Sequence, residues 1–254
     1  MAKVLGESGR YVKKQSTKLY QKQFLLLLIW IAALMLLDGY LLGIRKYPFA
    51  VLLTLLFLII IFFSLKWVNR KIEEIETEKI NFRKGAAGEI IIGNLLDTFP
   101  HDYYVINDLT TPFGNIDHVV IGPSGSYVID TKHWKGTVSA DSNGELLLNG
   151  KPTDKPEIKK FTHRLMDIQK KIQTLSSLDP FIQGVFVFPS AYIEAKWGTT
   201  GYVHCVRGDQ LYEYIVENKR SKKLNQNKVD SISRAFMALA RMDKKFESST
   251  PGDK

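Results

Sequence analysis

The chain has 254 residues, enough for one large domain or two small ones, and a single cysteine, Cys205, which excludes an intrachain disulfide and is expected to be a small buried apolar residue. Its net charge of +9 is uneven, because residues 1–68 hold nine Lys and Arg against two Asp and Glu, whereas residues 69–254 hold 26 against 24. The sequence pI near 9.4 therefore reflects mostly the first part of the chain, and it is no argument for nucleic-acid binding by the second.

Two apolar segments follow a basic N-terminal segment, residues 1–23. Each apolar segment, at about 24–44 and 48–67, has about the twenty residues needed to cross a hydrocarbon core. Only a short basic turn separates them, so residues 24–68 are predicted to form a transmembrane hairpin with the lipid bilayer as its partner. Basic side chains are denser at the outer ends of the hairpin than in the turn, which predicts cytoplasmic termini and a cytoplasmic second part at the cell membrane.

Asp38 is the one ionisable residue within a predicted span. A carboxylate in a membrane is by default a functional residue. Asp38, however, lies near the outer end of the first span, and the second span offers no Lys, Arg or His as a partner. We interpret it as a solvated residue at a span end.

A charged stalk helix is predicted over residues 69–84, because Glu and Lys recur there at helical spacing. Gly85 and Gly88 are predicted to open a separate helix at about 86–99. Glu89 falls on the apolar stripe of this helix, an unusual place for a carboxylate. Two interpretations are open: the helix dipole favours a glutamate in the first turn, or Glu89 belongs to a functional site.

The central feature of the chain is a pair of apolar runs, 116–121 and 127–131, that flank Gly-Pro-Ser-Gly and predict a β-hairpin. Residues two apart in a strand share a face, so Asp130 and Lys132 are expected to point the same way. Asp117 lies on the partner strand among apolar residues, where a charge is costly unless it is paired or binds a cation. The hairpin therefore predicts a divalent-metal site beside a lysine.

The remaining pattern alternates strands and helices. A strand before the hairpin and two after it are expected to form a meander, followed by an amphipathic helix, two strands and two further helices. The expected ranges are about 103–109, 137–141, 145–148, 156–178, 181–188, 202–206, 209–218 and 225–246. This order predicts an α/β fold with a mixed central sheet flanked by helices.

Three motifs carry a resemblance to a known family: Gly85-Ala-Ala-Gly-Glu89, Phe113-Gly-Asn-Ile-Asp-His-Val-Val-Ile-Gly-Pro123 and Val128-Ile-Asp-Thr-Lys132. Over about residues 83–190 the chain resembles the nuclease-related domain (NERD) family of the PD-(D/E)XK nuclease superfamily. The resemblance implies a restriction-endonuclease-like fold, preceded here by the two transmembrane helices and the stalk. The expected domain covers residues 85–206, C-terminal helices cover 207–247, and a polar tail covers 248–254.

The resemblance also implies a chemistry, the metal-dependent hydrolysis of phosphodiester bonds in nucleic acid, with DNA as the expected substrate. The implied catalytic residues are Glu89, Asp117, Asp130 and Lys132. Mg²⁺ or Mn²⁺ would take oxygen ligands from Asp117, Asp130, Glu89 and the backbone carbonyl of Thr131. Lys132 would orient the attacking water or stabilise the charge that develops on the phosphate.

Two features keep a second interpretation open. The family carries Gln three residues after a proline, whereas here Pro156 is followed by Lys159, and the part after residue 68 is nearly neutral. The domain is therefore either a membrane-anchored nuclease or an inactive nuclease-derived module that binds nucleic acid or a protein partner. Basic residues of the 156–178 helix could contact phosphates or form a solvated face, namely Lys159, Lys160, Arg164, Lys170 and Lys171.

Other candidate side chains have plainer interpretations. Strand alternation turns His118 and His133 away from the faces of their acidic or basic neighbours. Trp134 is expected to pack in the core at a strand end. His101 and His204 lack the ligand spacing of a zinc site.

Overall fold

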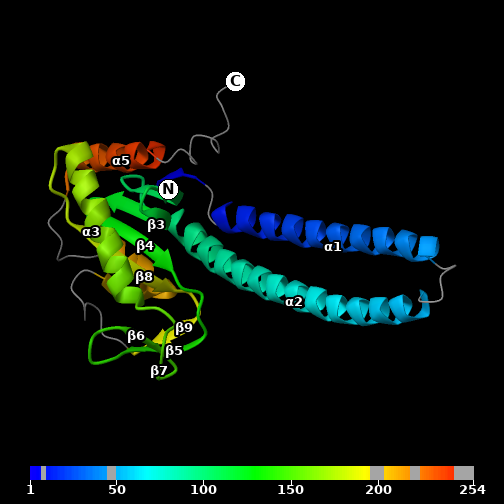
Figure 1. Ribbon diagram of the computed structural model, residues 1–254. Coiled ribbons are helices and arrows are strands. Elements are labelled where there is room, and N and C mark those ends of the chain that lie inside the picture. The colour runs from blue at the N-terminus through cyan, green and yellow to red at the C-terminus, as the bar shows by residue number, and fades with distance from the viewer. Residues whose placement is uncertain (7–9, 45–49, 195–202, 218–223, 243–254) are drawn as a thin grey trace. The chain divides into compact units, whose positions relative to one another are not determined.

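A computed structural model describes residues 1–6, 10–44, 50–194, 203–217 and 224–242 (Figure 1). The chain divides into two compact units, one formed by Val12–Arg83 and the other by Met1–Tyr11 together with Lys84–Lys254. The first unit is helical, and the second contains the sheets. The polar tail predicted for 248–254 lies outside the described residues.

The helical unit is built from α1 (Arg10–Ile44) and from the first part of α2 (Ala50–Leu96). The predicted spans, 24–44 and 48–67, fall on these two helices, and the turn predicted between them lies outside the described residues. Among the described residues, one segment, Thr17–Leu36, is long and apolar enough to cross a membrane by length and composition. The transmembrane hairpin is therefore not confirmed.

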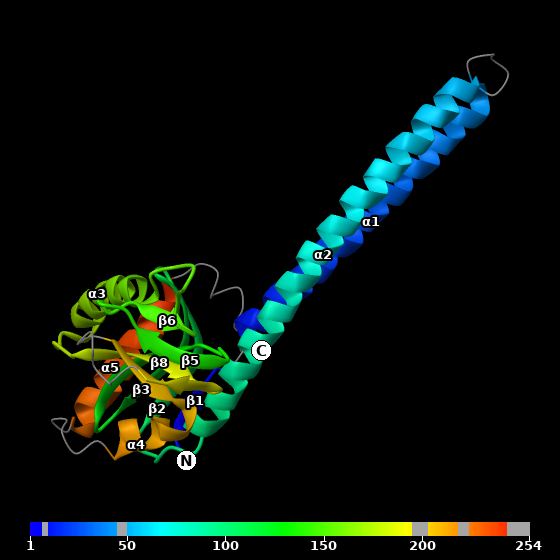
Figure 2. The ribbon, with the colours of Figure 1, turned by 90° about the horizontal axis from the view of Figure 1, so that it is seen from below.

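The two helices of this unit run side by side along their length (Figure 2). The Trp30 indole N–H donates to Ser64 Oγ at 3.3 Å. Nearer the other end of the pair, the Lys79 ammonium lies over the Tyr20 ring, 3.7 Å from its centroid. Low numbers on α1 thus meet high numbers on α2, which is antiparallel packing. The side chain of Asp38 lies outside the described residues.

Helix α2 continues without a break through Gly85 and Gly88. The prediction of a separate helix at 86–99 is wrong. A glycine inside a helix costs only about 1 kcal/mol and keeps its backbone N–H, so good helix formers on both sides carry the helix through. The stalk predicted at 69–84 is accordingly a middle segment of α2.

The second unit contains a six-stranded mixed sheet with the strand order β1-β2-β3-β4-β8-β10. Its strands are β1 (Lys3–Leu5), β2 (Tyr104–Thr111), β3 (Gly114–Gly122), β4 (Gly125–Thr131), β8 (Ile182–Phe188) and β10 (Val203–Arg207). The pairs β2–β3 and β3–β4 are antiparallel, and the other three pairs are parallel. The predicted hairpin and the predicted mixed sheet are confirmed.

Strand β1 corrects the prediction that residues 1–23 are only a basic segment. Lys3 is paired with Tyr104 and Leu5 with Ile106 in a parallel ladder. The Lys3 ammonium also donates to the Tyr104 hydroxyl at 3.0 Å. Three residues are too few to show a strand periodicity, so this strand forms because β2 offers it an edge.

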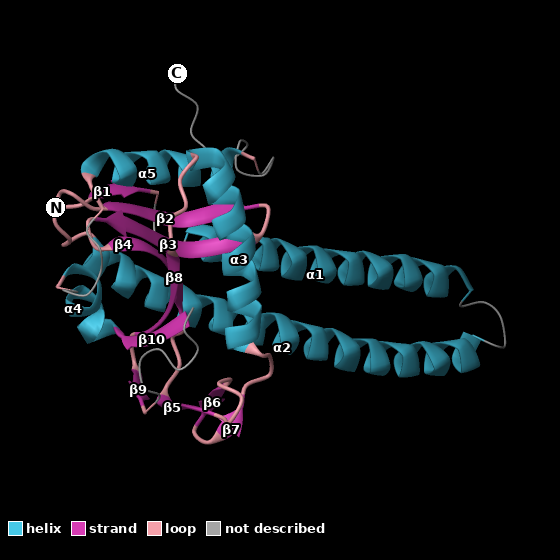
Figure 3. Cartoon of the chain, turned by 90° about the vertical axis from the view of Figure 1, so that its left-hand side faces the viewer, coloured by secondary structure: helices cyan, strands magenta, loops and turns pink. Residues whose placement is uncertain are grey.

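A second, four-stranded sheet contains β5 (Gly136–Ala140), β6 (Leu146–Leu148), β7 (Lys151–Pro152) and β9 (Ala191–Ile193), in the order β7-β6-β5-β9 (Figure 3). The prediction that β5 and β6 extend the central meander is wrong. Both edges of β4 are occupied, by β3 on one side and β8 on the other. The chain after β4 therefore has no place beside that strand.

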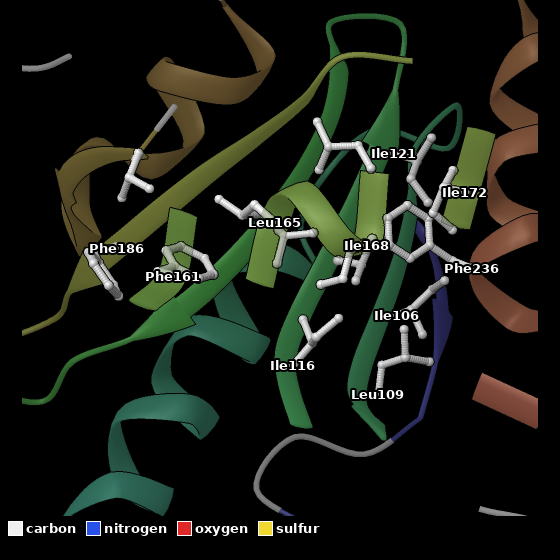
Figure 4. Close-up of a cluster of buried hydrophobic side chains, with 14 of the residues drawn as sticks. Ile106, Leu109, Ile116, Ile121, Phe161, Leu165, Ile168, Ile172, Phe186 and Phe236 are labelled. Carbon is white, nitrogen blue, oxygen red and sulfur yellow. The ribbon is translucent and has the colours of Figure 1, made fainter. Parts of the chain in front are cut away.

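Helices α3 (Glu157–Ser176) and α5 (Gln226–Arg241) cover one face of the large sheet. Figure 4 shows apolar side chains of α3 against the sheet, with Leu165 and Ile168 in the centre, Phe161 beside Phe186 of β8, and Ile172 near Phe236 of α5. A second core cluster contains Ile92 and Leu96 from the end of α2 and Leu211 from the short α4 (Leu211–Val216). Helix α4 follows the 3-10 turn η1 (Gly208–Gln210). The amphipathic helix and the buried 181–188 strand are both confirmed.

Candidate functional site

The candidate site lies where β3 and β4 end their pairing. The ladder between these strands runs from Gly122–Gly125 to His118–Ile129, which brings Asp117 beside the end of β4. There the Asp117 carboxylate accepts the backbone N–H of Thr131 at 2.7 Å, through Oδ2. A side chain thus takes the place that a backbone carbonyl would hold in a continued ladder.

Asp130, at the end of β4, is held by two cations. Its Oδ1 lies 2.9 Å from the Lys132 ammonium, and its Oδ2 lies 2.9 Å from Nη2 of Arg164 on α3. The Lys132 ammonium has a second carboxylate partner, Oε2 of Glu157, at 3.1 Å. The four charged groups form a chain, Arg164–Asp130–Lys132–Glu157, which ties the end of β4 to the first turns of α3.

Arg164 is anchored at a second point. Its Nη1 donates to the backbone carbonyl of Asn115 in β3 at 3.1 Å, and its guanidinium carbon lies 5.1 Å from the centroid of the Phe161 ring. Its Nε is buried and has no hydrogen-bond partner in the part of the chain that the structure describes. A buried donor without an acceptor costs about 1–3 kcal/mol. The Arg164 guanidinium is therefore less favourably placed than one whose N–H groups all have acceptors.

Glu89 reaches the site from α2 and is buried, with 8% of its surface exposed. Close approach of the helix depends on Gly88, where a Cβ would lie 2.8 Å from the Cβ of His133 and 3.3 Å from Cγ2 of Thr131. His133 also ties the strand end to α2, because its Nδ1 lies 2.7 Å from the carbonyl oxygen of Lys84. The absence of a side chain at Gly88 thus allows α2 to carry Glu89 against β4.

The charges of the site shift its pKa values in a consistent way. Burial raises the pKa of Asp117 well above its ordinary value, and the carboxylates of Asp130 and Glu89 raise it further. Burial lowers the pKa of Lys132, but Asp130 and Glu157 outweigh this effect and raise it. Asp117 therefore lies close enough to Glu89, Asp130 and Lys132 for the charge of each to act on it.

The two histidines beside the site take no part in its charge cluster. His118 is fully buried, its Nδ1 lies 2.8 Å from Oδ1 of Asn107, and burial lowers its pKa to about 3. His133 contacts Lys84, as described above, and Ser190. Trp134 packs against Phe188, with ring centroids 5.5 Å apart.

Cys205 is 5% exposed, as predicted for a small apolar residue of the core. Burial raises the pKa of its thiol to about 12, so the group stays protonated at neutral pH.

The N-terminus of α3 is capped by a side chain from the small sheet. The Glu145 carboxylate, at the β5–β6 turn, accepts the backbone N–H groups of Ile158 and Lys159 at 3.0 and 2.9 Å. It satisfies two of the unpaired donors at the helix N-terminus and places a negative charge at the positive end of the helix dipole. The small sheet thereby sets the position of Glu157, next to Lys132.

The donor groups suit a hard divalent cation in part. Three carboxylates approach one another, and Thr131 Oγ1 is buried without a hydrogen-bond partner among the described residues. Both Asp130 oxygens, however, are engaged by cations, and no group of three or more His, Cys, Asp or Glu in the described ranges is arranged to hold an ion. The residue types fit Mg²⁺ or Mn²⁺, and each Asp130 oxygen keeps a lone pair beside its contact with a cation.

Sequence reasoning missed Glu157 and Arg164 as site residues. Arg164 was grouped with the basic face of the helix, yet it points to Asp130 while Lys159 and Lys160 are exposed. The signal was present: residues 157, 161, 164 and 168 follow one another at helical spacing, so both charges fall beside buried apolar positions. The same argument had singled out Glu89 on α2.

Comparison with known proteins finds a family domain that spans the residues of the site. Residues 84–189 match the family model of the nuclease-related domain, NERD. An uncharacterized protein of Bacillus anthracis is 25% identical over 171 residues, which cover 65% of this chain and 80% of that protein. No solved structure matches the chain. The matched range contains Glu89, Asp117, Asp130 and Lys132, together with Glu157 and Arg164.

Proposed function

We propose that the chain is a membrane-anchored, divalent-metal-dependent nuclease that hydrolyses phosphodiester bonds of DNA at the cytoplasmic face of the membrane. A nuclease-related domain at residues 84–189 supports the reaction class. The observation that carries the proposal is the meeting of Glu89, Asp117 and Asp130 beside the Lys132 ammonium, which leaves Asp117 with a raised pKa. Such a set attracts a cation and places a fixed positive charge next to it.

Each side chain has a distinct part in this proposal. Glu89, Asp117 and Asp130, with the carbonyl of Thr131, would hold Mg²⁺ or Mn²⁺ through oxygen ligands. The bound ion supplies a Lewis acid that polarises the phosphate and lowers the pKa of a bound water. Lys132 stays protonated and offers its ammonium to the attacking water or to the charge that grows on the phosphate. Glu157 keeps that ammonium in place by pairing with it.

The replacement of Lys132 by Ala tests this assignment in the full chain. If the ammonium stabilises the transition state, single-turnover DNA cleavage should fall by about a hundredfold or more. DNA affinity, measured with the same substrate, should change little, because one phosphate contact among several contributes modestly. Lys132→Arg should not restore the rate, since a planar guanidinium does not replace a compact ammonium.

Lys135→Ala is the matched control, because Lys135 is exposed and lies only three residues further along the chain. It should retain the cleavage rate of the wild type. Equal cleavage by the wild type and Lys132→Ala would refute the catalytic assignment even with the fold unchanged.

A second candidate function is a catalytically inactive module that binds nucleic acid or a protein partner at the membrane. Two observations favour it: both Asp130 oxygens are paired with cations, and Lys159 stands where the family carries Gln. In this case neither the wild type nor Lys132→Ala cleaves DNA with Mg²⁺ or Mn²⁺. Any loss of DNA affinity in the variant would then depend on salt.

The proposed anchor is a hairpin of two spans, about 24–44 and 48–67, with both termini cytoplasmic. Strand β1, which precedes α1, pairs with β2, which follows α2. The chain must therefore return to the side from which it started, so α1 and α2 either both cross the bilayer or both stay out of it. The apolar length of the first span favours crossing.

Labelling of single cysteines tests the anchor. In a Cys205→Ser background, a membrane-impermeant maleimide added to intact cells should label a cysteine introduced near position 46. It should not label one near position 10 or 250. The reverse pattern would overturn the orientation, and labelling at position 10 with protection at 250 would overturn the hairpin.

A further inference from the structure

Strand β2 contains a residue with a left-handed backbone, directly across from Asp117 of β3. We propose that Asp108 is a positioning residue, whose left-handed backbone and hydrogen bond to Asn115 turn the Asp117 carboxylate toward the end of β4. The inference rests on the proposed function in one respect, because Asp117 is a proposed metal ligand. It adds a residue that acts on the site through the strand that carries the ligand.

The first observation is an interruption in the register of the strands. The β2–β3 register passes over one position, where Asp108 would pair with Asp117, while the positions on both sides of it are paired. The β3–β4 register ends just before the position where Asp117 would pair with Asp130. Asp108 has a φ of 55°, and it is the only residue other than glycine with a positive φ inside a described strand. Few residues other than glycine adopt such a value, and Asp and Asn tolerate it best.

The second observation is a shift of the side-chain alternation at the same place. In a regular strand, residues three apart point to opposite faces of the sheet. Ile106 and Leu109 of β2 nevertheless belong to the same core cluster, the one that contains the apolar residues of α3, and Figure 4 shows them close together. Ile116 and Val119 of β3 also belong to this cluster. Both strands therefore shift their alternation by one residue, at the position that the register passes over.

The shift explains how the Asp117 side chain can take the place of a backbone carbonyl. Side chains of a regular strand stand roughly perpendicular to the sheet. The N–H groups that join neighbouring strands point along the sheet instead, so their acceptors lie near its plane. Asp117 Oδ2 accepts the Thr131 N–H at 2.7 Å, which places this carboxylate near that plane. An extended residue in place of Asp108 would restore the alternation and turn Asp117 to one face.

The side chain of Asp108 holds the same segment of β3. Its Oδ1 accepts an N–H of the Asn115 side-chain amide at 2.9 Å. Asn115 lies two residues before Asp117, and its backbone carbonyl accepts Nη1 of Arg164. The Asp108 carboxylate thus anchors β3 at Asn115, and the Asp108 backbone turns β3 at Asp117.

The first experiment needs no metal. Residue-resolved hydrogen–deuterium exchange of the full chain in detergent compares the N–H of Thr131 with that of Lys132 as the internal reference. The Lys132 N–H donates to β8, through the Val187 carbonyl at 2.8 Å, so it is held by another strand. In Asp108→Val the ratio of the Thr131 rate to the Lys132 rate should rise by about tenfold, because a hydrogen bond to a charged acceptor contributes about that factor. Valine favours an extended backbone and is a rare outlier at positive φ.

Two other substitutions at this position should leave the exchange ratio close to that of the wild type. Asp108→Gly adopts the left-handed backbone without steric cost. Asp108→Asn tolerates positive φ and keeps an oxygen that can accept from Asn115. Asp108→Ala crowds the left-handed backbone less than valine does, so it should raise the ratio by a smaller factor, and it replaces the valine variant if that protein does not fold.

Ser177→Val is the matched control. Ser177 is exposed and also has a φ of 55°, but it lies after the end of α3, at the opposite end of that helix from Glu157. Valine is disfavoured there for the same reason as at Asp108. The control should therefore lower the stability of the fold and leave the exchange ratio unchanged.

The second experiment measures Mn²⁺ affinity by isothermal titration calorimetry for the same proteins. Asp108→Val should bind Mn²⁺ about tenfold more weakly than the wild type, which is the scale of effect for residues that orient metal ligands. Asp108→Gly, Asp108→Asn and Ser177→Val should bind Mn²⁺ as the wild type does.

The outcomes separate this inference from the proposed function. A raised exchange ratio and weaker Mn²⁺ binding in Asp108→Val, without either in the control, support the inference. An unchanged ratio in Asp108→Val overturns it, and so does an equal rise in Ser177→Val, because loss of stability then suffices. An equal effect of Asp108→Asn and Asp108→Val also overturns it, since the charge of Asp108 would then matter rather than its backbone.

Two results concern the metal. If Asp108→Val raises the exchange ratio but binds Mn²⁺ as the wild type does, the role of Asp108 in the metal site is overturned. If the wild type binds no Mn²⁺, the metal dependence of the proposed function is wrong, and the exchange ratio alone decides whether Asp108 positions Asp117.

Discussion

The ends of β3 and β4 carry two aspartates that lie side by side and are held in opposite ways. Asp117 accepts a backbone N–H and has no ion pair with Lys or Arg among the described residues, and burial raises its pKa. Asp130 is paired with Lys132 and with Arg164. The buried carboxylate of Asp117 destabilises the metal-free fold, whereas the paired carboxylate of Asp130 stabilises it. Substitutions that remove each charge should therefore act with opposite sign.

The largest effect is expected for Asp130→Asn. The substitution removes the charge that two cations share, and it leaves Lys132 and Arg164 short of a partner. The free energy of unfolding should fall by about 2 kcal/mol, since the groups are only partly exposed. Thermal unfolding of the full chain in detergent measures it. Asp209→Asn, which breaks the exposed pair with Arg207, serves as the control and should change stability by less than about 1 kcal/mol.

Asp117→Asn should stabilise the metal-free protein, because the amide oxygen still accepts the Thr131 N–H and no charge is buried. A carboxyl whose pKa is raised on folding supports the fold fully at low pH and loses that contribution as pH rises through the folded-state pKa. The advantage of Asn should therefore grow as the pH rises from about 4 through the folded-state pKa of Asp117, by about 1.4 kcal/mol per unit of raised pKa. Unfolding measured across this range tests the sign.

The same variant should lose the stabilisation that millimolar Mg²⁺ or Mn²⁺ gives the wild type. If Asp117→Asn proves less stable than the wild type at every pH, the two aspartates are held alike and the contrast is wrong. If neither metal stabilises the wild type, the metal site itself is wrong.

The smallest effect is expected for Glu157→Gln. Glu157 pairs with Lys132 and acts on Asp130 only through that ammonium. The ammonium keeps Asp130 as its partner, so the loss should be about 0.5–1 kcal/mol. Comparison with the double variant Glu157→Gln/Asp130→Asn in a thermodynamic cycle gives the coupling between the two carboxylates. A coupling energy of zero would mean that they do not share Lys132.

Much of the site could be predicted because its charges stand out from apolar patterns. Glu89 interrupts the stripe of a helix, and Asp117, Asp130 and Lys132 interrupt two strands that are otherwise apolar. The contributions of Glu157 and Arg164 could not be predicted in the same way. Their partners depend on the approach of α3 to β4, and that approach is set by the cap that Glu145 provides from another sheet.

In the fold too, the elements set by short-range sequence patterns could be predicted, and those set by contacts between distant segments could not. The hairpin of β3 and β4, helix α3 and strand β8 follow from short-range periodicity, and each lies close to its predicted place. The separate small sheet could not be foreseen, because β8 takes the edge of β4 only after the chain has passed through α3. The continuity of α2 through Gly85 was missed because glycine lowers helix propensity without ending a helix.

Strand β1 has a consequence for the order in which the molecule folds. It precedes β2 in the chain, yet Lys3 and Tyr104 are 101 positions apart, with both long helices between them. Closing so large a loop carries an entropic cost that three residues do not recover until the rest of the sheet exists. β1 should therefore dock last, after β2, β3 and β4 have paired. Until then the edge of β2 is an open template for another chain, and the docking of β1 closes it.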